Sequence, residues 1–199
     1  MANNQWDERF SQAEYYYGTQ PNVFFKEELN KLKAGRVLLL GEGEGRNGVY
    51  AAQCSWHVDA VDASAEGKKK ALALAQHRNT TLNYTVQNLE MFDPQENMYD
   101  AVGLIFVHLP ELLRKRIHAR SIAALKPGGR IILEAFAKEQ ITKNSGGPKN
   151  IEFLYSTDII TRDFMLIKTI MLAQETVELN EGEHHYGEAI VVRFVGEKK

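Results

Sequence analysis

A chain of 199 residues, of which 44% are hydrophobic and 25% charged, is long enough for one domain with a sizeable core. Its formal net charge of −2 argues against a nucleic-acid partner, because proteins that bind nucleic acid usually carry a basic excess. The polar start and the short apolar runs predict neither a signal peptide nor a membrane span, and the single Cys54 fits a reducing cytoplasm.

From residue 36 onwards, strand-like and helix-like segments alternate along the chain. Short apolar runs predict strands, and runs of helix formers bounded by capping residues predict helices. Lys-Pro-Gly-Gly is expected to break the last of these helices. The expected strands cover 36–41, 56–64, 82–88, 99–107 and 130–136, and the expected helices cover 45–54, 65–78 and 110–125.

The end of the chain departs from this alternation. Two strand-like runs, 164–182 and 187–197, are joined by a polar turn and look like a hairpin added to the sheet edge. Strands that alternate with helices imply parallel pairing with right-handed crossovers. The sequence therefore predicts an α/β fold, namely a Rossmann-like doubly wound sheet of about seven strands, mainly parallel, with a C-terminal antiparallel hairpin.

The glycine-rich stretch RVLLLGEGEGRNG, residues 36–48, admits a dinucleotide phosphate site, a site for another nucleotide-like cofactor, or only a tight turn. Gly43–Gly48 fits G-x-G-x-x-G, and Asp62 follows at about the 20-residue spacing at which an acid meets the ribose in dinucleotide-binding folds. Taken alone, this spacing favours an NAD-linked oxidoreductase. A second pattern, G-x-G-x-G beginning at Gly41, overlaps the first and shares Asp62.

Two glutamates inside the loop distinguish the patterns. A pyrophosphate seeks bare backbone N–H groups at a helix N-terminus, and Glu42 and Glu44 would place carboxylates beside it. S-adenosylmethionine has no phosphate; it presents a sulfonium cation, an ammonium and a carboxylate, so acids at the loop can be useful. The chain also ends in a hairpin, not in a second mononucleotide-binding half. The loop therefore favours S-adenosylmethionine, with S-adenosylhomocysteine as the product.

A set of motifs spread along the chain carries a family resemblance. They are WDERFSQAEYYYGTQPN near the start, the glycine loop with EGEGRN, Asp62, FVHLP after the fourth strand, LKPGGRIILEAF, NSGGPKN, and EGEHHYG in the final hairpin. With these motifs the chain resembles, nearly end to end, a small bacterial class I S-adenosylmethionine-dependent methyltransferase near the tellurite-resistance and thiopurine methyltransferase-like branch.

The resemblance implies a single methyltransferase domain over residues 1–199. Its parts are an N-terminal lid and helical segment (1–35), a cofactor-binding βαβ core (36–136), and a substrate-side loop, helix and hairpin (137–199). The family pattern would place the methionine part of the cofactor against three glycines of the loop and the ribose hydroxyls against the acid that ends the second strand. These residues are Gly41, Gly43, Gly45 and Asp62.

Further cofactor contacts implied by the resemblance come from the ends of the next strands. Ala63 and Ser64 would lie near the adenine, Asn88 and Leu89 would meet its edge, and Phe106 would lie near the methionine moiety. Such positions agree with the rule that ligands bind at the carboxyl ends of strands near the topological switch point.

The loop departs from the family at one position. Most members carry an acid two residues before the first glycine, where this chain has Leu39. We expect Glu42 to substitute as the partner of the cofactor's amino group, and a surface role for Glu42 is the alternative.

Four residues are candidates for the transfer step itself. His108 directly follows the fourth strand, and His185 lies in the hairpin that folds back over the same edge; each is a candidate base or acceptor-orienting group. A structural role is the alternative for both. Tyr15 and Tyr17, with Asn22, are candidates for a lid over the site, where a tyrosine face near sulfur favours the cation. No spaced ligand set predicts a metal site.

The acceptor is expected to be a small molecule. The chain has no Asp/Asn-Pro-Pro-Tyr type motif after the fourth strand and no inserted target-recognition domain. A thiol, a metalloid or a similar nucleophile is the closest analogy, and a monomer or homodimer without a membrane or nucleic-acid partner is expected. An NAD-linked oxidoreductase and a non-catalytic S-adenosylmethionine-binding domain remain the alternatives.

Overall fold

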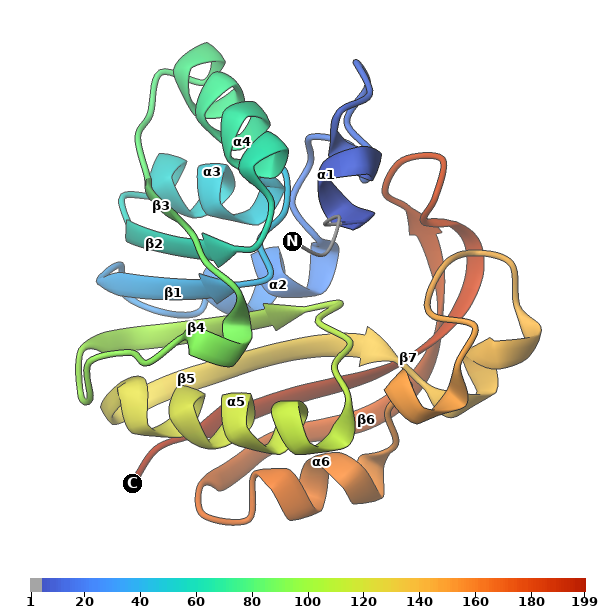
Figure 1. Ribbon diagram of the computed structural model, residues 1–199. Helices are drawn as coiled ribbons and strands as arrows, with labels where there is room; N and C mark the ends of the chain where they lie inside the picture. Colours follow the sequence, from blue (N-terminus) through green and yellow to red (C-terminus); the bar gives the residue numbers. More distant parts are fainter. Residues whose placement is uncertain (1–4) are drawn as a thin grey trace.

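The computed structural model describes residues 5–199, and its strands form one seven-stranded sheet (Figure 1). The first four residues of the predicted N-terminal segment lie outside the described part. The strand order across the sheet is β3-β2-β1-β4-β5-β7-β6. In chain order the strands are β1 (Arg36–Leu40), β2 (His57–Asp62), β3 (Asn83–Val86), β4 (Tyr99–Ile105), β5 (Leu125–Phe136), β6 (Lys168–Asn180) and β7 (Tyr186–Glu197).

Helices connect these strands and cover the sheet. Over the described residues the α-helices are α1 (Gln5–Phe10), α2 (Val23–Leu29), α3 (Arg46–Gln53), α4 (Ala65–His77), α5 (Glu111–Ala124) and α6 (Thr157–Asp163). Three short 3-10 helices are η1 (Leu89–Met91), η2 (Lys138–Thr142) and η3 (Ile151–Phe153). Within residues 5–199, no helix is both long enough and apolar enough to cross a membrane.

The sheet is parallel from β3 through β5, and β7 pairs antiparallel with both β5 and β6. The predicted Rossmann-like fold with a C-terminal hairpin is therefore confirmed. The chain builds outward from β1 to β3, then returns to place β4 on the other side of β1. The order thus reverses between β1 and β4, and the carboxyl ends of these two strands are where such folds bind ligands.

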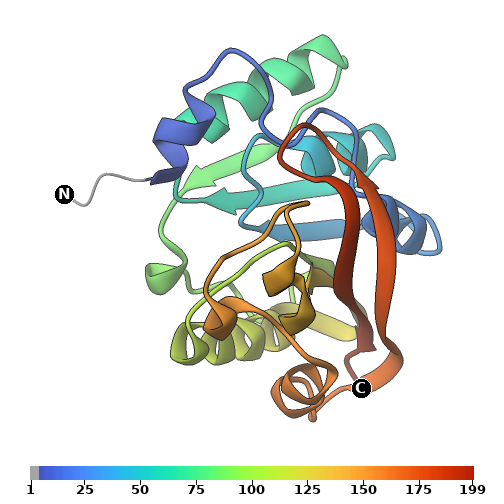
Figure 2. The same cartoon turned by 90° about the vertical axis from the view of Figure 1, so that its right-hand side faces the viewer.

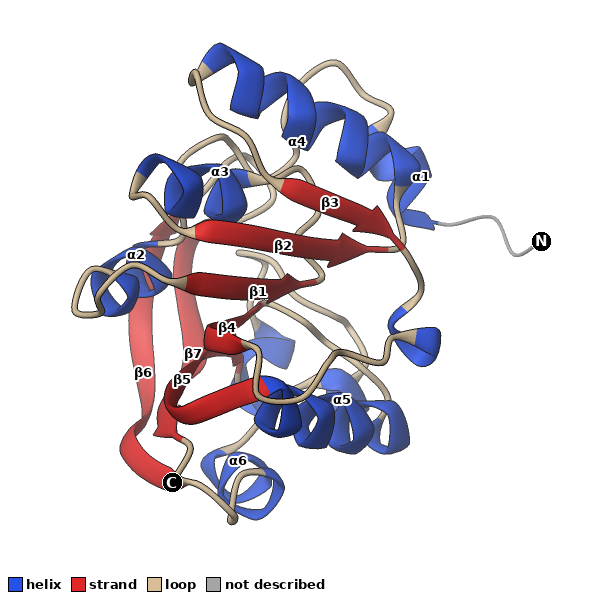
Figure 3. Ribbon diagram, turned by 90° about the vertical axis from the view of Figure 1, so that its left-hand side faces the viewer, coloured by secondary structure: helices blue, strands red, loops and turns tan. Residues whose placement is uncertain are grey.

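Alternation along β1 divides the core between the two faces of the sheet. Leu38 and Leu40 belong to the cluster that includes Ile117 of α5, whereas Val37 and Leu39 belong to the cluster of α2 and α3. Successive side chains of a strand point to opposite faces, so a wholly apolar strand must be covered on both. Figure 3 shows the helices on the two sides of the sheet.

The structure differs from the sequence prediction at two places. Strand β5 begins at Leu125, so the Lys-Pro-Gly-Gly segment lies inside it and not in a free connection. Gly128 takes a left-handed φ of 79°, and the chain end pairs with this segment, since the Gly128 N–H donates to the Lys198 carbonyl. The bounds of helix α1 were not predicted within the expected N-terminal lid and helical segment; its apolar face buries Phe10.

The loop between α1 and α2, residues 11–22, is called the strap here. It passes from α4 to the turn between β6 and β7, so the N-terminal strap meets the C-terminal hairpin there (Figure 2). The approach is close at Gly18 and Gly182, because a Cβ on Gly182 would lie 2.9 Å from the Gly18 nitrogen. The strap therefore bridges the glycine-loop side of the sheet and the hairpin.

Candidate cofactor and acceptor site

The glycine loop after β1 requires residues without a Cβ. Gly41, Gly43 and Gly45 have φ angles of 65°, 60° and 89°, which side-chain-bearing residues rarely adopt. A Cβ on Gly45 would also lie 2.5 Å from the Cβ of Ala71 in α4. The Tyr84 hydroxyl of β3 donates to the Gly43 carbonyl at 2.6 Å and so ties the loop to the third strand. Alternating left-handed residues turn the chain sharply from β1 into α3.

Asp62, at the end of β2, ties this loop to the next one. Its Oδ2 accepts from the Gly43 N–H at 2.9 Å, and its Oδ1 accepts from the Ser64 N–H at 2.8 Å. Burial raises the pKa of Asp62 from its ordinary value. Each carboxylate oxygen has a second lone pair, so the group can still accept from a ligand's hydroxyls. Asp62 is therefore both a structural brace and a possible ribose acceptor.

The residues predicted near the adenine follow β2 and β3 at the same edge. Ser64 caps α4, because its Oγ accepts from the Gly67 N–H at 2.9 Å, and the same hydroxyl donates to Asp7 of α1. Ala63 lies beside it and hydrogen-bonds Asp62 through its backbone. Asn88 caps η1 by accepting from the Glu90 N–H at 2.9 Å. Leu89 is buried beside it.

The two acids of the loop have different environments. Glu42 is buried, and its Oε1 accepts from the Gly48 N–H in the first turn of α3 at 2.6 Å. Burial raises the pKa of Glu42 to about 7, although the hydrogen bond from Gly48 and the charge of Arg46 oppose the rise. Leu39, where the family usually has an acid, packs in the core of α2 and α3.

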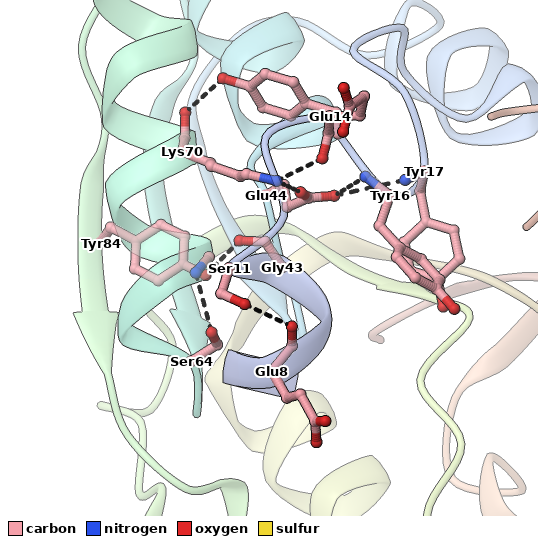
Figure 4. Close-up of polar contacts among 12 residues, drawn as sticks. Glu8, Ser11, Glu14, Tyr16, Tyr17, Gly43, Glu44, Ser64, Lys70 and Tyr84 are labelled. Carbon is pink, nitrogen blue, oxygen red and sulfur yellow. Dashed lines mark hydrogen bonds and ion pairs between the residues drawn. The ribbon is translucent and has the colours of Figure 1, made fainter. Parts of the chain in front are cut away.

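Glu44 holds the strap to the loop, a role that the sequence did not indicate. Its Oε2 accepts from the backbone N–H of Tyr16 at 2.7 Å and of Tyr17 at 3.4 Å, and its Oε1 pairs with Lys70 of α4 at 2.7 Å. The same lysine donates to the Glu14 carbonyl, so the Lys70–Glu44 pair binds the strap backbone at Glu14, Tyr16 and Tyr17 (Figure 4).

Three of the predicted residues come together in an aromatic cluster at the carboxyl edge of β4 and β5. The ring of His185 lies 4.6 Å from Phe106 and 4.3 Å from Tyr17, and Phe136 lies 5.2 Å from the same imidazole. Phe106 has a φ of 54°, a strained conformation for a bulky residue that is typical of functional sites. Burial lowers the pKa of His185 and raises that of Tyr17 to about 12.

His108 stacks on Phe136 of this cluster, with ring centroids 5.6 Å apart, and both of its ring nitrogens are engaged. Nδ1 lies 2.7 Å from the Phe153 carbonyl, and Nε2 accepts from the Phe136 N–H at 3.4 Å. Burial lowers the pKa of His108 to about 4. The ring is therefore neutral and bonds the end of β5 to the loop before α6.

The structure does not bring Tyr15 to the cluster. Its hydroxyl donates to the Lys70 carbonyl at 3.0 Å, and its ring packs against Val49, Leu74 and Ala75 between α3 and α4. Tyr15 thus anchors the start of the strap, while Tyr17 faces the histidine.

Asn22, at the end of the strap, is the centre of a buried polar network. Its Nδ2 donates to Glu134 of β5 at 2.6 Å and to Glu181 of the hairpin turn at 2.9 Å. Its backbone N–H donates to Asn47 of α3 at 2.9 Å. Beside the network the strap and hairpin enclose a cavity of about 260 Å³, lined in part by Glu134, Glu181 and Arg193. Glu134 and Glu181 lie within the LKPGGRIILEAF and EGEHHYG motifs, but nothing in the sequence indicated that they meet at Asn22.

Part of the chain is similar to methyltransferases of known family. Residues 37–129 match the family model of a methyltransferase domain. No curated protein sequence matches the chain.

Solved structures share the fold at low identity. TehB from Haemophilus influenzae is 17% identical with a TM-score of 0.77, over 98% of this chain and 67% of that one. The N-methyltransferase NodS from Bradyrhizobium japonicum, in complex with S-adenosyl-L-homocysteine, is 12% identical with a TM-score of 0.71, over 98% and 97%. A protein associated with conversion of a disulfide bond into a thioacetal group during echinomycin biosynthesis is 13% identical with a TM-score of 0.76, over 97% and 88%.

The sheet order and the glycine loop define the Rossmann-like methyltransferase class. Residues 37–129 form a methyltransferase domain, and NodS, which shares the fold, was solved with S-adenosyl-L-homocysteine bound. This result favours the second glycine pattern over the NAD-linked alternative.

Proposed function

We propose that this methyltransferase acts on a small-molecule nucleophile of the thiol or metalloid class, by in-line displacement. The observation that carries the proposal is the convergence of a buried, neutral histidine with Tyr17 and Phe106 beneath the strap. When bound, S-adenosylmethionine supplies a methyl group on a sulfonium, which becomes neutral as the methyl leaves. The protein then has to align the nucleophile and exclude water.

The described residues fit the cofactor at the end of β1 and β2. The left-handed glycines 41, 43 and 45 leave the backbone bare, and the Asp62 carboxylate can accept from both ribose hydroxyls. We assign the adenine surroundings to Ala63, Ser64, Asn88 and Leu89, which follow β2 and β3 at the same edge.

Glu42 is the proposed partner of the cofactor's ammonium group. The carboxyl is buried, with a pKa near neutrality, so a nearby cation would favour its ionised form. The carboxyl already interacts with the backbone N–H groups of Gly48 and Asn47, and the ammonium would be a further donor to it. Leu39 and the Glu42 carboxyl both lie beside Gly48, which supports the substitution of one for the other.

His185 is the proposed base for the acceptor. Its lowered pKa keeps the imidazole neutral near pH 7, so it can receive a proton from a thiol, whose ordinary pKa is about 8.5. Tyr17 remains protonated, and its ring covers the histidine. His108 has both nitrogens bonded to the backbone and is assigned an orienting role for the end of β5.

The position of the strap is evidence for a small acceptor, because the strap covers the edge of the sheet. Tyr16 stacks on His184 at 3.5 Å, so the strap and the hairpin cover the edge from above. The fold likeness to a protein associated with disulfide-to-thioacetal conversion supports a sulfur nucleophile, and the motifs shared with the tellurite-resistance branch support a metalloid.

An acceptor panel tests this proposal. Purified protein is incubated with S-adenosylmethionine and alkyl thiols, aromatic thiols, selenite, tellurite or primary amines, and S-adenosylhomocysteine and the methylated product are measured by mass spectrometry. Turnover of a thiol or metalloid that falls at least tenfold in His185→Gln is expected. Turnover of amines alone would overturn the acceptor class. Binding of S-adenosylhomocysteine without turnover of any acceptor would favour the non-catalytic alternative.

A further inference from the structure

The turn between β6 and β7 contains a buried carboxylate that the reaction as described does not use. Glu181 lies in this turn and is buried. Burial alone would raise its pKa, but the interaction with His185 and the charge of Arg46 lower the pKa to about 2. The group is therefore an anion held inside the protein, which is costly unless its oxygens are paired.

Only one of the two oxygens is well paired. Oε1 accepts from the Asn22 amide at 2.9 Å. Oε2 lies 2.9 Å from the Arg46 guanidinium and 3.5 Å from Nδ1 of His185, yet neither contact has the geometry of a hydrogen bond. Among residues 5–199, both Oε2 of Glu181 and Nδ1 of His185 are buried without a hydrogen-bond partner. Nδ1 of His185 thus faces an oxygen that has an ion pair with Arg46 but no hydrogen bond.

Unsatisfied buried polar atoms are rare in folded proteins and call for a reason. Hydrogen bonds of catalytic groups are often long in the free protein and tighten when ligands bind. Here a movement of a few tenths of an ångström would bring 3.5 Å within the ordinary range of about 2.7–3.2 Å. The pair is therefore poised to form a carboxylate–histidine dyad.

The partners that hold Glu181 come from the two segments that surround the cofactor. Arg46 directly follows Gly45 of the glycine loop and also donates to the Tyr17 carbonyl at 3.3 Å. Asn22 ends the strap and donates to Asn47, the next residue of α3, at 2.9 Å. A shift of the loop or of the strap therefore moves the groups that hold the carboxylate.

Resting on the proposed role of His185, we propose that Glu181 is its positioning residue, and that the dyad closes when the glycine loop and the strap are both in their ligand-bound positions. Glu181 accepts the Nδ1–H of the imidazole and fixes this tautomer, which leaves the Nε2 lone pair for the acceptor. As the acceptor–methyl bond forms and the methyl–sulfur bond breaks, with its electron pair left on sulfur, Nε2 takes the acceptor's proton. The proton then passes to solvent.

The charged groups around the His185 imidazole determine how its pKa should change when Glu181 is replaced. The groups that face it are Glu181 from the turn, Arg46 from α3, Tyr17 from the strap, the adjacent His184, and the neutral His108 at the end of β4. Glu181 is the anion among them. Removing its charge leaves Arg46 to oppose protonation of His185, so the pKa of the histidine should fall.

The test compares Glu181→Gln with Glu183→Gln, which changes an exposed acid in the same turn. Two acceptors are used at neutral pH: an alkyl thiol that is mostly protonated and an aromatic thiol that is already ionised. The Glu181→Gln variant should turn over the alkyl thiol at least tenfold more slowly, with the acidic limb of the kcat/KM profile moved to lower pH. It should retain most of its rate with the ionised thiol, and Glu181→Asp should recover part of the alkyl-thiol rate.

Equal losses with both thiols would show a structural role and overturn the positioning proposal. If His185→Gln leaves the alkyl-thiol rate unchanged, the base assignment itself is wrong. Nitrogen NMR of the protein bound to S-adenosylhomocysteine gives a readout independent of turnover. The Nδ1–H tautomer of His185 should predominate in the natural protein and give way to a mixture in Glu181→Gln. Identical tautomers and pKa values in both would contradict the proposal.

Discussion

Glu42 should make the stability of the cofactor-free protein fall as pH rises. Its carboxyl is buried in the glycine loop, and burial raises its pKa to about 7 from an ordinary value of 4.5. Between these values the folded state holds a proton that the unfolded state releases, so raising the pH favours unfolding. The loss begins near pH 4.5 and is complete a little above pH 7.

The size of the effect follows from the gap between the two pKa values. At roughly 1.4 kcal/mol for each pKa unit, the shift from 4.5 to about 7 corresponds to about 3 kcal/mol of unfolding free energy. Glu42→Gln removes the charge but keeps an oxygen that can accept from the Gly48 N–H. The variant should match the natural protein near pH 4.5 and exceed its stability by up to about 3 kcal/mol at pH 8.

Urea unfolding of the cofactor-free protein between pH 4.5 and 8.5 measures this difference. Asp62 and Glu134 also have pKa values raised by burial, so only the difference between the variant and the natural protein isolates Glu42. Glu27→Gln, which changes an exposed acid of α2, is the matched control and should keep the natural pH slope. Parallel pH profiles for Glu42→Gln and the natural protein would refute the reasoning.

Three further outcomes are expected from the cofactor side. Asp62→Asn should weaken S-adenosylhomocysteine by about tenfold to a hundredfold in calorimetry, because charge-assisted hydrogen bonds contribute roughly 1.5–3 kcal/mol; unchanged affinity in the folded variant would refute the ribose assignment. Glu42→Gln should weaken S-adenosylmethionine more than 5′-methylthioadenosine, which lacks the amino-acid end, and equal weakening would mean that Glu42 only shapes the loop. Limited proteolysis at Tyr15–Gln20 should slow when S-adenosylhomocysteine is added, whereas cleavage indifferent to the ligand would leave the strap as packing alone.

The order of strands and helices could be predicted because its signals are local. The apolar run of β1, the Ser64 cap of α4 and the turn residues between elements each act within a few positions of the sequence. The exact start of β5 could not be predicted, since its first residues are drawn into the sheet by pairing with the chain end at Lys198. That contact joins residues far apart in the sequence.

The roles of the site residues divide in the same way. The glycine spacing and Asp62 indicated the loop geometry, yet Glu42 and Glu44 looked alike in the sequence, although one caps α3 and the other holds the strap. The two histidines also looked alike. His108 meets the Phe153 carbonyl, and His185 meets Glu181, so tertiary contacts alone separate their chemistry.

In the segment that runs from the glycine loop into α3, four consecutive residues have four different structural roles. Glu44 holds the strap through two backbone N–H groups, Gly45 turns the loop, Arg46 reaches Glu181, and Asn47 accepts from Asn22. Each polar contact contributes only roughly 1–3 kcal/mol. Because the contacts share one short and sterically fixed backbone, the strap and the hairpin cannot move far from the cofactor loop without breaking several of them. A movement of the glycine loop would therefore shift Arg46 and Glu181, and with them the carboxylate that faces His185.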